Sequence, residues 1–220
     1  LDGDADRIIF CDEKGQIVDG DQIMALIAGY MHETEALKGE GIVSTIMSNM
    51  GLEDYVNGLG LALHRSKVGD RYVIETMREY GINFGGEQSG HVIMSDFGTT
   101  GDGLIAALQV LAVYKEKTDK KGGKASDIFH VFDTYPQVMK NVHVDDKSIA
   151  SDADIITLIA ELEEKLGNGR IVLRPSGTEP LIRVMAEAQD YKWAEKTVDT
   201  LIKAIEKASA GTTSKQTSAA

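Results

Sequence analysis

The densest set of chemically useful side chains in this sequence is a loop near its C-terminus, Arg-Pro-Ser-Gly-Thr-Glu-Pro at 174–180, with an arginine shortly after it. Hydroxyls and backbone amides of a glycine-containing loop can surround an oxyanion, and arginine adds a forked, charged donor that matches phosphate oxygens. The residues expected to bind phosphate are Arg174, Ser176, Gly177, Thr178 and Arg183. The segment is not a P-loop, because it lacks Gly-Lys-Ser/Thr and its flanks favour strand–loop–strand. A β-hairpin stiffened by prolines is the alternative.

A second candidate site lies at the start of the chain, where Asp2, Asp4 and Asp6 alternate with small residues. Carboxylates this close repel one another unless a cation offsets their charge. An all-oxygen set suits Mg²⁺, which keeps positions open for water or a substrate phosphate. Arg7 follows directly, where it can clamp the same phosphate. The alternatives are a solvated acidic turn and a calcium EF-hand loop ending at Glu13, although Arg7 stands where that loop needs glycine.

A third candidate is the glycine-rich segment Gly-Gly-Glu-Gln-Ser-Gly-His at 85–91. In an extended conformation Glu87, Ser89 and His91 lie on one face, because alternate side chains point the same way. Glutamate and serine suit the hydroxyls of a sugar, and histidine is the commonest acid–base group near neutral pH. A turn with capping polar groups is the alternative.

Lys67 opens a further basic segment, Lys-Val-Gly-Asp-Arg at 67–71. It is either a ligand contact or the entry to a helix for which Asp70 is the N-cap.

The hydrophobic pattern predicts an α/β scaffold beneath the first three segments. Strands are expected at 8–12, 16–18, 42–46, 62–64, 82–84 and 92–94, with helices at 19–34, 52–59, 70–80 and 100–117. A charged, glycine-bearing break at 117–124 is the expected hinge. After it the pattern predicts a helix at 126–132, a strand at 137–144, a helix at 151–166, a hairpin of 170–174 and 181–188, and a helix at 191–207. The fold class is therefore a mixed α/β domain followed by a small α+β domain.

Composition excludes several classes of protein. The net charge of −12 over 220 residues argues against a nucleic-acid surface. Cys11 is the single cysteine, so no internal disulfide forms, and no apolar run approaches the roughly 20 residues of a membrane span. The chain is expected to be soluble and cytoplasmic. Because Leu1 stands directly before a dense motif, we expect the C-terminal portion of a longer protein, with a disordered tail at 210–220.

In this order, DGDADR, GGEQSGH and RPSGTEP resemble the signature segments of the α-D-phosphohexomutase superfamily, over nearly the whole chain up to about residue 208. Members of that superfamily have four domains around a cleft, and each domain contributes one loop. The resemblance implies the end of domain 2 at 1–16, domain 3 at 17–123 and domain 4 at 124–209. Gln88 and the stretch 68–73 resemble the bacterial branch that acts on glucosamine phosphates, with the phosphomannose/phosphoglucose branch as the alternative.

The resemblance implies an isomerase that interconverts glucosamine 6-phosphate and glucosamine 1-phosphate through a phosphoserine and a bisphosphate. It assigns the cofactor Mg²⁺ to Asp2, Asp4 and Asp6, and sugar hydroxyls to Glu87 and Ser89. His91, Arg7 and Lys67 are the catalytic candidates, and the unreacting phosphate is assigned to Arg174, Ser176, Gly177, Thr178 and Arg183. The product feeds cell-wall amino sugar synthesis.

The sequence departs from the superfamily at one decisive point, because no Ser-His-Asn-Pro phosphoserine segment occurs in these 220 residues. The isolated chain is therefore expected to be inactive. The expected partners are a phosphosugar and the preceding domains of the same protein, with a homodimer left open. A non-catalytic phosphosugar-binding module and a Ca²⁺-binding interaction protein are the competing interpretations.

Overall fold

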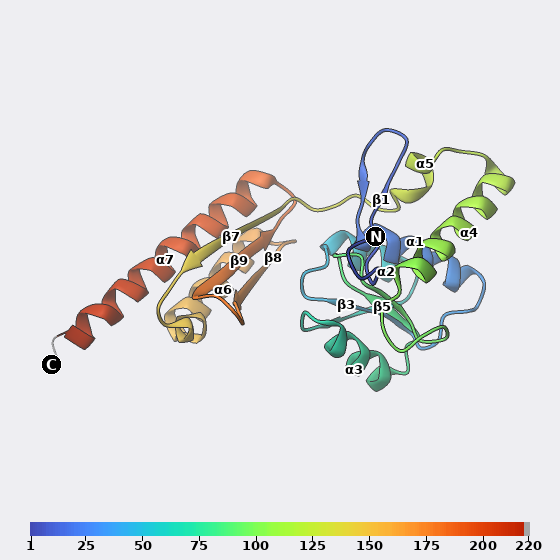
Figure 1. Ribbon diagram of the computed structural model, residues 1–220. Helices are drawn as coiled ribbons and strands as arrows, with labels where there is room; N and C mark the ends of the chain where they lie inside the picture. The colour runs from blue at the N-terminus through green and yellow to red at the C-terminus, as the bar shows by residue number, and fades with distance from the viewer. Residues whose placement is uncertain (218–220) are drawn as a thin grey trace. The chain divides into compact units, whose positions relative to one another are not determined.

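The computed structural model describes residues 1–217 and divides them into two compact units, Leu1–Thr134 and the residues from Tyr135 onward (Figure 1). Among the described residues, no helix is both long enough and apolar enough to cross a membrane. The two units contain different kinds of sheet, and each is described by itself.

The first unit is built on a four-stranded sheet with the strand order β4-β3-β5-β6. Strand β3 runs parallel to β4 and β5, and β6 is an antiparallel edge strand. The bounds are β3 Gly41–Thr45, β4 Ala62–Ser66, β5 Phe84–Gly86 and β6 Val92–Met94. A two-stranded hairpin of β1 (Phe10–Cys11) and β2 (Ile17–Val18) precedes this sheet. The mixed, largely parallel sheet confirms the predicted α/β class.

Helices cover both faces of this sheet because its central strand is apolar on both sides. Ile42 packs into the core formed with α1, α2 and α4, whereas Val43 packs with Val73 and Met77 of α3. The helix bounds are α1 Gly20–Glu33, α2 Met50–Gly58, α3 Asp70–Tyr80, α4 Gly103–Lys121 and α5 Ala125–Phe129.

Side-chain caps set the start of several helices. Asp19 caps α1 by accepting from the Gln22 amide, and Asp102 caps α4. The prediction that Asp70 caps α3 is wrong. Gly69 is the N-cap residue, and Asp70 is the first residue of the helix.

The division between the units lies after the expected boundary at 123/124, because α5 packs on the first unit. The Phe129 ring lies 5.8 Å from that of Phe10 and 5.3 Å from that of Tyr114. The segment that the sequence predicts as the start of the second domain therefore contributes to the first core.

The second unit is a three-stranded antiparallel sheet with the order β7-β9-β8, which confirms the predicted α+β class. Helices α6 and α7 pack on the face that presents Ile182 and Val184. The bounds are β7 Gln137–His143, 3₁₀ helix η1 Lys147–Ser151, α6 Ala153–Leu166, β8 Arg170–Pro175, β9 Leu181–Glu187 and α7 Tyr191–Thr217.

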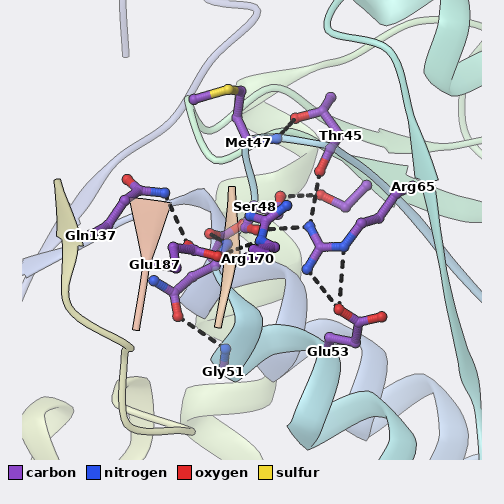
Figure 2. Close-up of polar contacts among 12 residues, drawn as sticks. Thr45, Met47, Ser48, Gly51, Glu53, Arg65, Gln137, Arg170 and Glu187 are labelled. Atoms are coloured by element: carbon purple, nitrogen blue, oxygen red, sulfur yellow. Dashed lines mark hydrogen bonds and ion pairs between the residues drawn. The ribbon is translucent and has the colours of Figure 1, made fainter. Parts of the chain in front are cut away.

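Two polar features complete the description of the second unit. The fully buried carboxylate of Glu187 pairs with Arg170 and accepts from Gln137 (Figure 2). Helix α7 continues past residue 210 as far as Thr217, whereas the sequence predicts a disordered tail over 210–220. Residues 218–220 lie outside the described residues.

Candidate functional site

The carboxyl ends of three parallel strands meet at one edge of the first sheet, the place where open α/β sheets bind ligands. The 67–69 loop follows β4, and the 85–91 segment leaves β5 at Gly86. Two of the sequence-predicted segments are thus brought to the same edge by the parallel pairing of β3 with its neighbours.

Arg65 braces a third loop at this edge, the one that follows β3 (Figure 2). Its Nη1 donates to the carbonyl oxygens of Thr45 at 3.3 Å and Ser48 at 2.8 Å. The other side of the guanidinium binds Glu53, with Nε at 3.2 Å and Nη2 at 2.9 Å from Oε2. Because the side chain spans strand, loop and helix, it holds this edge of the sheet in one shape.

Glu87 joins the 67–69 loop to the 85–91 segment. Its Oε1 accepts from the Gly69 amide at 2.7 Å, and its Oε2 accepts from the Ser89 hydroxyl at 3.3 Å. Of the two conformations that the sequence left open, extended or turn, the structure has the turn, because Gly90 N donates to the Glu87 carbonyl at 3.0 Å. Glu87 and Ser89 nevertheless lie together, while His91 points elsewhere.

Lys67 is exposed and lies on the loop that Glu87 holds. Its Nζ is 5.7 Å from the centre of the Tyr72 ring, within reach of a cation–π contact. The ammonium group thus lies near the Tyr72 ring on an exposed loop at this edge of the sheet, and its catalytic role stays a prediction.

The acidic loop, residues 2–7, brings Asp2, Asp4 and Asp6 together as the sequence predicts. One carboxylate oxygen from each lies within 4.8 Å of the others. Ala5 adopts a left-handed φ of 62°, a backbone conformation that costs free energy in a non-glycine residue and tightens the loop.

Arg7 supplies the charge that faces these carboxylates. Its Nε lies 3.6 Å from oxygens of both Asp2 and Asp6, and its amide donates to Asp2 at 3.2 Å. Partial burial acts to raise the pKa of Asp2. The hydrogen bond from the Arg7 amide and the Arg7 charge favour the carboxylate, outweigh the burial and lower that pKa.

His91 is buried behind the acidic loop, with 7% of its side chain exposed, and its Nδ1 lies 3.2 Å from Asp6 Oδ2. Gly101 makes room for the ring, since a Cβ there would lie 2.4 Å from His91 Nε2. The other Asp6 oxygen, Oδ1, is buried and makes no hydrogen bond among the described residues, and the charged Arg7 Nε lies 3.6 Å from it. This all-oxygen set with a buried, unsatisfied oxygen fits a hard cation such as Mg²⁺.

The acidic loop and the 85–91 segment share backbone contacts. Ile8 N donates to the Gly90 carbonyl at 3.0 Å, and Arg7 and His91 form a β-bridge. Gly90 has a φ of +90°, and a Cβ there would lie 2.1 Å from the Ile8 carbonyl oxygen. Glycine is needed here for conformation and for space.

Glu13 does not join the acidic loop, which argues against a calcium EF-hand. Its carboxylate accepts from the amide and hydroxyl of Ser126 at 3.0 and 2.6 Å. The neighbouring Asp12 carboxylate accepts from Lys14, Gln16 and His130. These two acids fasten the β1–β2 turn to α5.

The arginine loop, residues 174–183, forms the tip of the β8–β9 hairpin, as the sequence predicts. Its register sets Arg174 directly opposite Arg183. Like charges at opposed positions destabilise a sheet, so this pairing favours an anion bridging them. Glu179 Oε2 lies 3.8 Å from Arg183 Nη2 and offsets part of the charge.

The loop between these arginines is shaped by Ser176, whose buried hydroxyl accepts from the Glu179 amide at 3.2 Å. Its own amide donates to Leu181 at 2.9 Å. Within the described part of the chain, the amides of Gly177 and Thr178 have no protein acceptor, and the space beside the Gly177 Cα is open. Two free amides and two arginines on one small unit suit an oxyanion.

The sequence analysis does not identify two residues that contact or adjoin the candidate site residues, one in each unit. Asn141 on β7 lies opposite Arg183 and extends the polar row across the sheet. Gly101 accommodates His91. The alternation of the 137–143 strand could have suggested Asn141, but no local signal identifies Gly101, because its neighbour is reached only through the fold.

Comparison with known proteins matches both units. Residues 19–135 match the family model described as phosphoglucomutase/phosphomannomutase, alpha/beta/alpha domain III. Residues 139–204 match the C-terminal domain of the same family.

Among curated relatives, the chain is 56% identical over 206 residues to a phosphoglucosamine mutase of Chelativorans sp. (strain BNC1), covering 93% of this chain and 45% of that protein. It is 53% identical to one from Methylorubrum populi, covering 96% of this chain and 46% of the relative. The chain thus spans about half the length of these relatives. The Aspergillus fumigatus N-acetylphosphoglucosamine mutase, solved with GlcNAc-6P and magnesium, shares the fold with a TM-score of 0.75 and 22% identity, over 93% of this chain and 51% of that one.

Proposed function

The chain belongs to the phosphoglucomutase/phosphomannomutase family, and from that premise we propose that it is the sugar- and phosphate-binding part of a phosphoglucosamine mutase. The complete protein would be an isomerase that interconverts glucosamine 6-phosphate and glucosamine 1-phosphate. The relatives that carry this name are 52–56% identical, which favours this branch over the phosphomannose and phosphoglucose enzymes.

The observation that carries the proposal is the opposed pair Arg174 and Arg183 beside the free amides of Gly177 and Thr178. We assign this loop to the phosphate that does not react. Anchoring one end of the substrate places the other end for transfer, and positioning of this kind accounts for much of the catalysis of phosphoryl transfer.

We assign the sugar hydroxyls to Glu87 and Ser89. Glu87 is held at one oxygen by the Gly69 amide, so its orientation is set before a ligand arrives. A carboxylate that is already oriented loses less conformational freedom on binding. We also assign Lys67 and Arg7 as catalytic candidates that contact a phosphoryl group, and the exposure of Lys67 together with the position of Arg7 beside Asp2 and Asp6 supports this.

We assign Mg²⁺ to Asp2, Asp4 and Asp6. When bound, the cation would neutralise charge that develops on the transferring phosphoryl group. His91 is a catalytic candidate by resemblance, but its ring contacts Asp6 and is almost fully buried, which supports a role in orienting that carboxylate. The isolated chain lacks the phosphoserine segment and should therefore turn over no sugar phosphate. Catalysis in the cytoplasm by the longer protein, with its preceding domains as partner, is part of the proposal.

The test is a titration of the ¹⁵N-labelled 220-residue chain with glucosamine 6-phosphate, glucose 6-phosphate and mannose 6-phosphate, followed by amide NMR. The proposal expects shifts at Gly177 and Thr178 with all three ligands, and larger shifts around Glu87 with the amino sugar. Equal responses around Glu87 would contradict the glucosamine assignment. A silent arginine loop with every ligand would contradict phosphate binding by this chain.

A further inference from the structure

Lys147 makes a contact with the arginine loop that none of the three motifs includes. Its Nζ donates to the carbonyl oxygen of Ser176 at 2.7 Å. Ser176 is itself buried and closes the loop through its hydroxyl. The ammonium group therefore binds the backbone of the residue that shapes the candidate phosphate site.

The position of Lys147 is set by its own short helix. It is the first residue of η1, for which Asp146 is the N-cap, with Asp146 Oδ1 accepting from the Ser148 amide at 2.8 Å. Ile149, two residues later, is buried in the core of the second unit. The side chain is half-buried, so its ammonium group approaches the loop from a fixed base.

The same segment also holds the far end of the loop. Val144 N donates to the Pro180 carbonyl oxygen at 3.1 Å. Residues 144–147 thus contact the loop at Ser176 and at Pro180, on either side of Gly177 and Thr178. The two free amides lie on the stretch of loop between these contacts.

The geometry of the peptide bond links the Lys147 contact to anion binding. In a planar trans peptide the carbonyl of one residue and the amide of the next point in opposite directions. A Ser176 carbonyl directed at Lys147 therefore directs the Gly177 amide away from Lys147. That amide has no protein acceptor within the described part of the chain.

We propose that Lys147 is a positioning residue of the arginine loop: it holds the Ser176 carbonyl so that the Gly177 amide is presented to a phosphate monoester. The inference rests on the proposed function of the loop. The contact also brings a positive charge to the backbone of the arginine loop at Ser176, and a hydrogen bond from an ammonium group is stronger than a neutral one.

The first test needs no ligand. In the full 220-residue chain, Lys147→Met should shift the Ser176 carbonyl ¹³C and the Gly177 amide ¹⁵N resonances, because the carbonyl loses its donor. Lys147→Arg retains a charged donor and should restore both resonances toward their wild-type positions. Unchanged resonances in Lys147→Met would overturn the proposal.

The second test is the affinity for glucosamine 6-phosphate, measured by calorimetry. Lys147→Met should weaken binding about tenfold, the size expected for a charged hydrogen bond, and Lys147→Arg should recover most of the loss. The matched control is Lys140→Met, which removes the same charge from a lysine that pairs with Asp199 on α7. The control should bind within about twofold of wild type, because exposed charges are weakly coupled.

The outcomes separate two failures. If wild type and Lys140→Met bind the ligand and Lys147→Met binds equally well, the positioning role is wrong while the phosphate loop stands. If wild type does not bind, the proposed function of the loop fails and the positioning role fails with it. If Lys140→Met weakens binding as much as Lys147→Met, net charge explains the effect and the proposal is overturned.

Discussion

The acidic loop of the first unit and the arginine loop of the second both hold like charges close together, but they use different parts of the chain to do so. Three carboxylates converge on a tight turn that contains a left-handed alanine, with Arg7 and His91 against them. The two arginines instead face each other through the register of a regular hairpin. One arrangement is supported by side chains from a neighbouring loop, and the other by strand pairing.

This difference indicates which substitutions should disturb the geometry of each site. A turn supported by neighbours should lose its geometry when a supporting residue changes, even if every carboxylate remains. The pair of arginines set by strand register should keep its geometry and lose only the charge that is removed, whereas the loop between them also contacts Lys147. The following changes test that contrast, beginning with the largest expected effect.

Arg183→Met should reduce the affinity for glucosamine 6-phosphate about 100-fold, because a bidentate charged contact is lost while β9 keeps its pairing. Calorimetry on the 220-residue chain measures the loss. The fold should be retained, with an unchanged melting temperature within about 2 °C. A collapse of the amide spectrum would show that the register depends on the charges, contrary to the contrast.

Gly101→Ala should weaken cation binding at the acidic loop about tenfold, although no carboxylate changes. The added methyl group meets His91 Nε2, so the ring must move and Asp6 loses its partner. Mn²⁺ binding followed by electron paramagnetic resonance provides the measurement. The control is Gly58→Ala, which also adds a methyl group to the first unit and has open space around it. Equal affinity in Gly101→Ala and wild type would contradict support by His91.

Acid should destabilise the first unit partly through Asp12. Burial acts to raise the pKa of this carboxyl, but hydrogen bonds from Gln16, His130 and Lys14 outweigh it and lower the pKa below its ordinary value of 3.8. Such a group stabilises the fold above pH 3.8, and the contribution is lost as the pH falls through the lowered pKa.

Asp12→Asn should therefore flatten the decline of melting temperature with falling pH in the acid range. The comparison is with wild type in thermal melts at pH 2 to 6. Asp119→Asn is the control, since that carboxylate is exposed and its ion pair among the described residues is with Lys115 on its own helix. Identical acid profiles for wild type and Asp12→Asn would show that the hairpin turn does not contribute.

The smallest effect is expected from Glu179→Gln. This carboxylate lies 3.8 Å from Arg183, and both side chains are about half exposed. Removing it should free Arg183 and strengthen phosphate binding about twofold, the scale of an exposed ion pair. A weaker affinity would mean that Glu179 supports the loop rather than competing with the ligand.

The sequence identifies the candidate ligand-binding residues of each site better than the residues that hold them in position. The arginine loop could be predicted because its donors are consecutive, and the alternation of apolar residues places them at a hairpin tip. Lys147 could not, since it meets Ser176 only after an intervening helix and strand have folded. The contact of His91 with Asp6 could not be predicted either, because the choice between an extended segment and a turn depends on close contacts at Gly90.

The same holds for the fold: features set by neighbouring residues in the sequence can be predicted, and features set by contacts between distant residues cannot. The α/β and α+β classes follow from hydrophobic periodicity, and the helices that Asp19 and Asp102 cap begin close to the starts expected from the sequence. The unit boundary does not follow from local pattern. A charged, glycine-bearing break is a plausible hinge, yet Phe129 packs beyond it on Phe10, and only the folded core shows this.

The β-bridge between Arg7 and His91 has a thermodynamic consequence. The acidic loop and the 85–91 segment share backbone hydrogen bonds, so ordering one restricts the other. If a divalent cation changes the affinity of the chain for an amino sugar phosphate by some factor, the sugar phosphate must change the affinity for the cation by the same factor. Two titrations, each repeated with the other ligand at saturation, measure one coupling free energy from opposite directions.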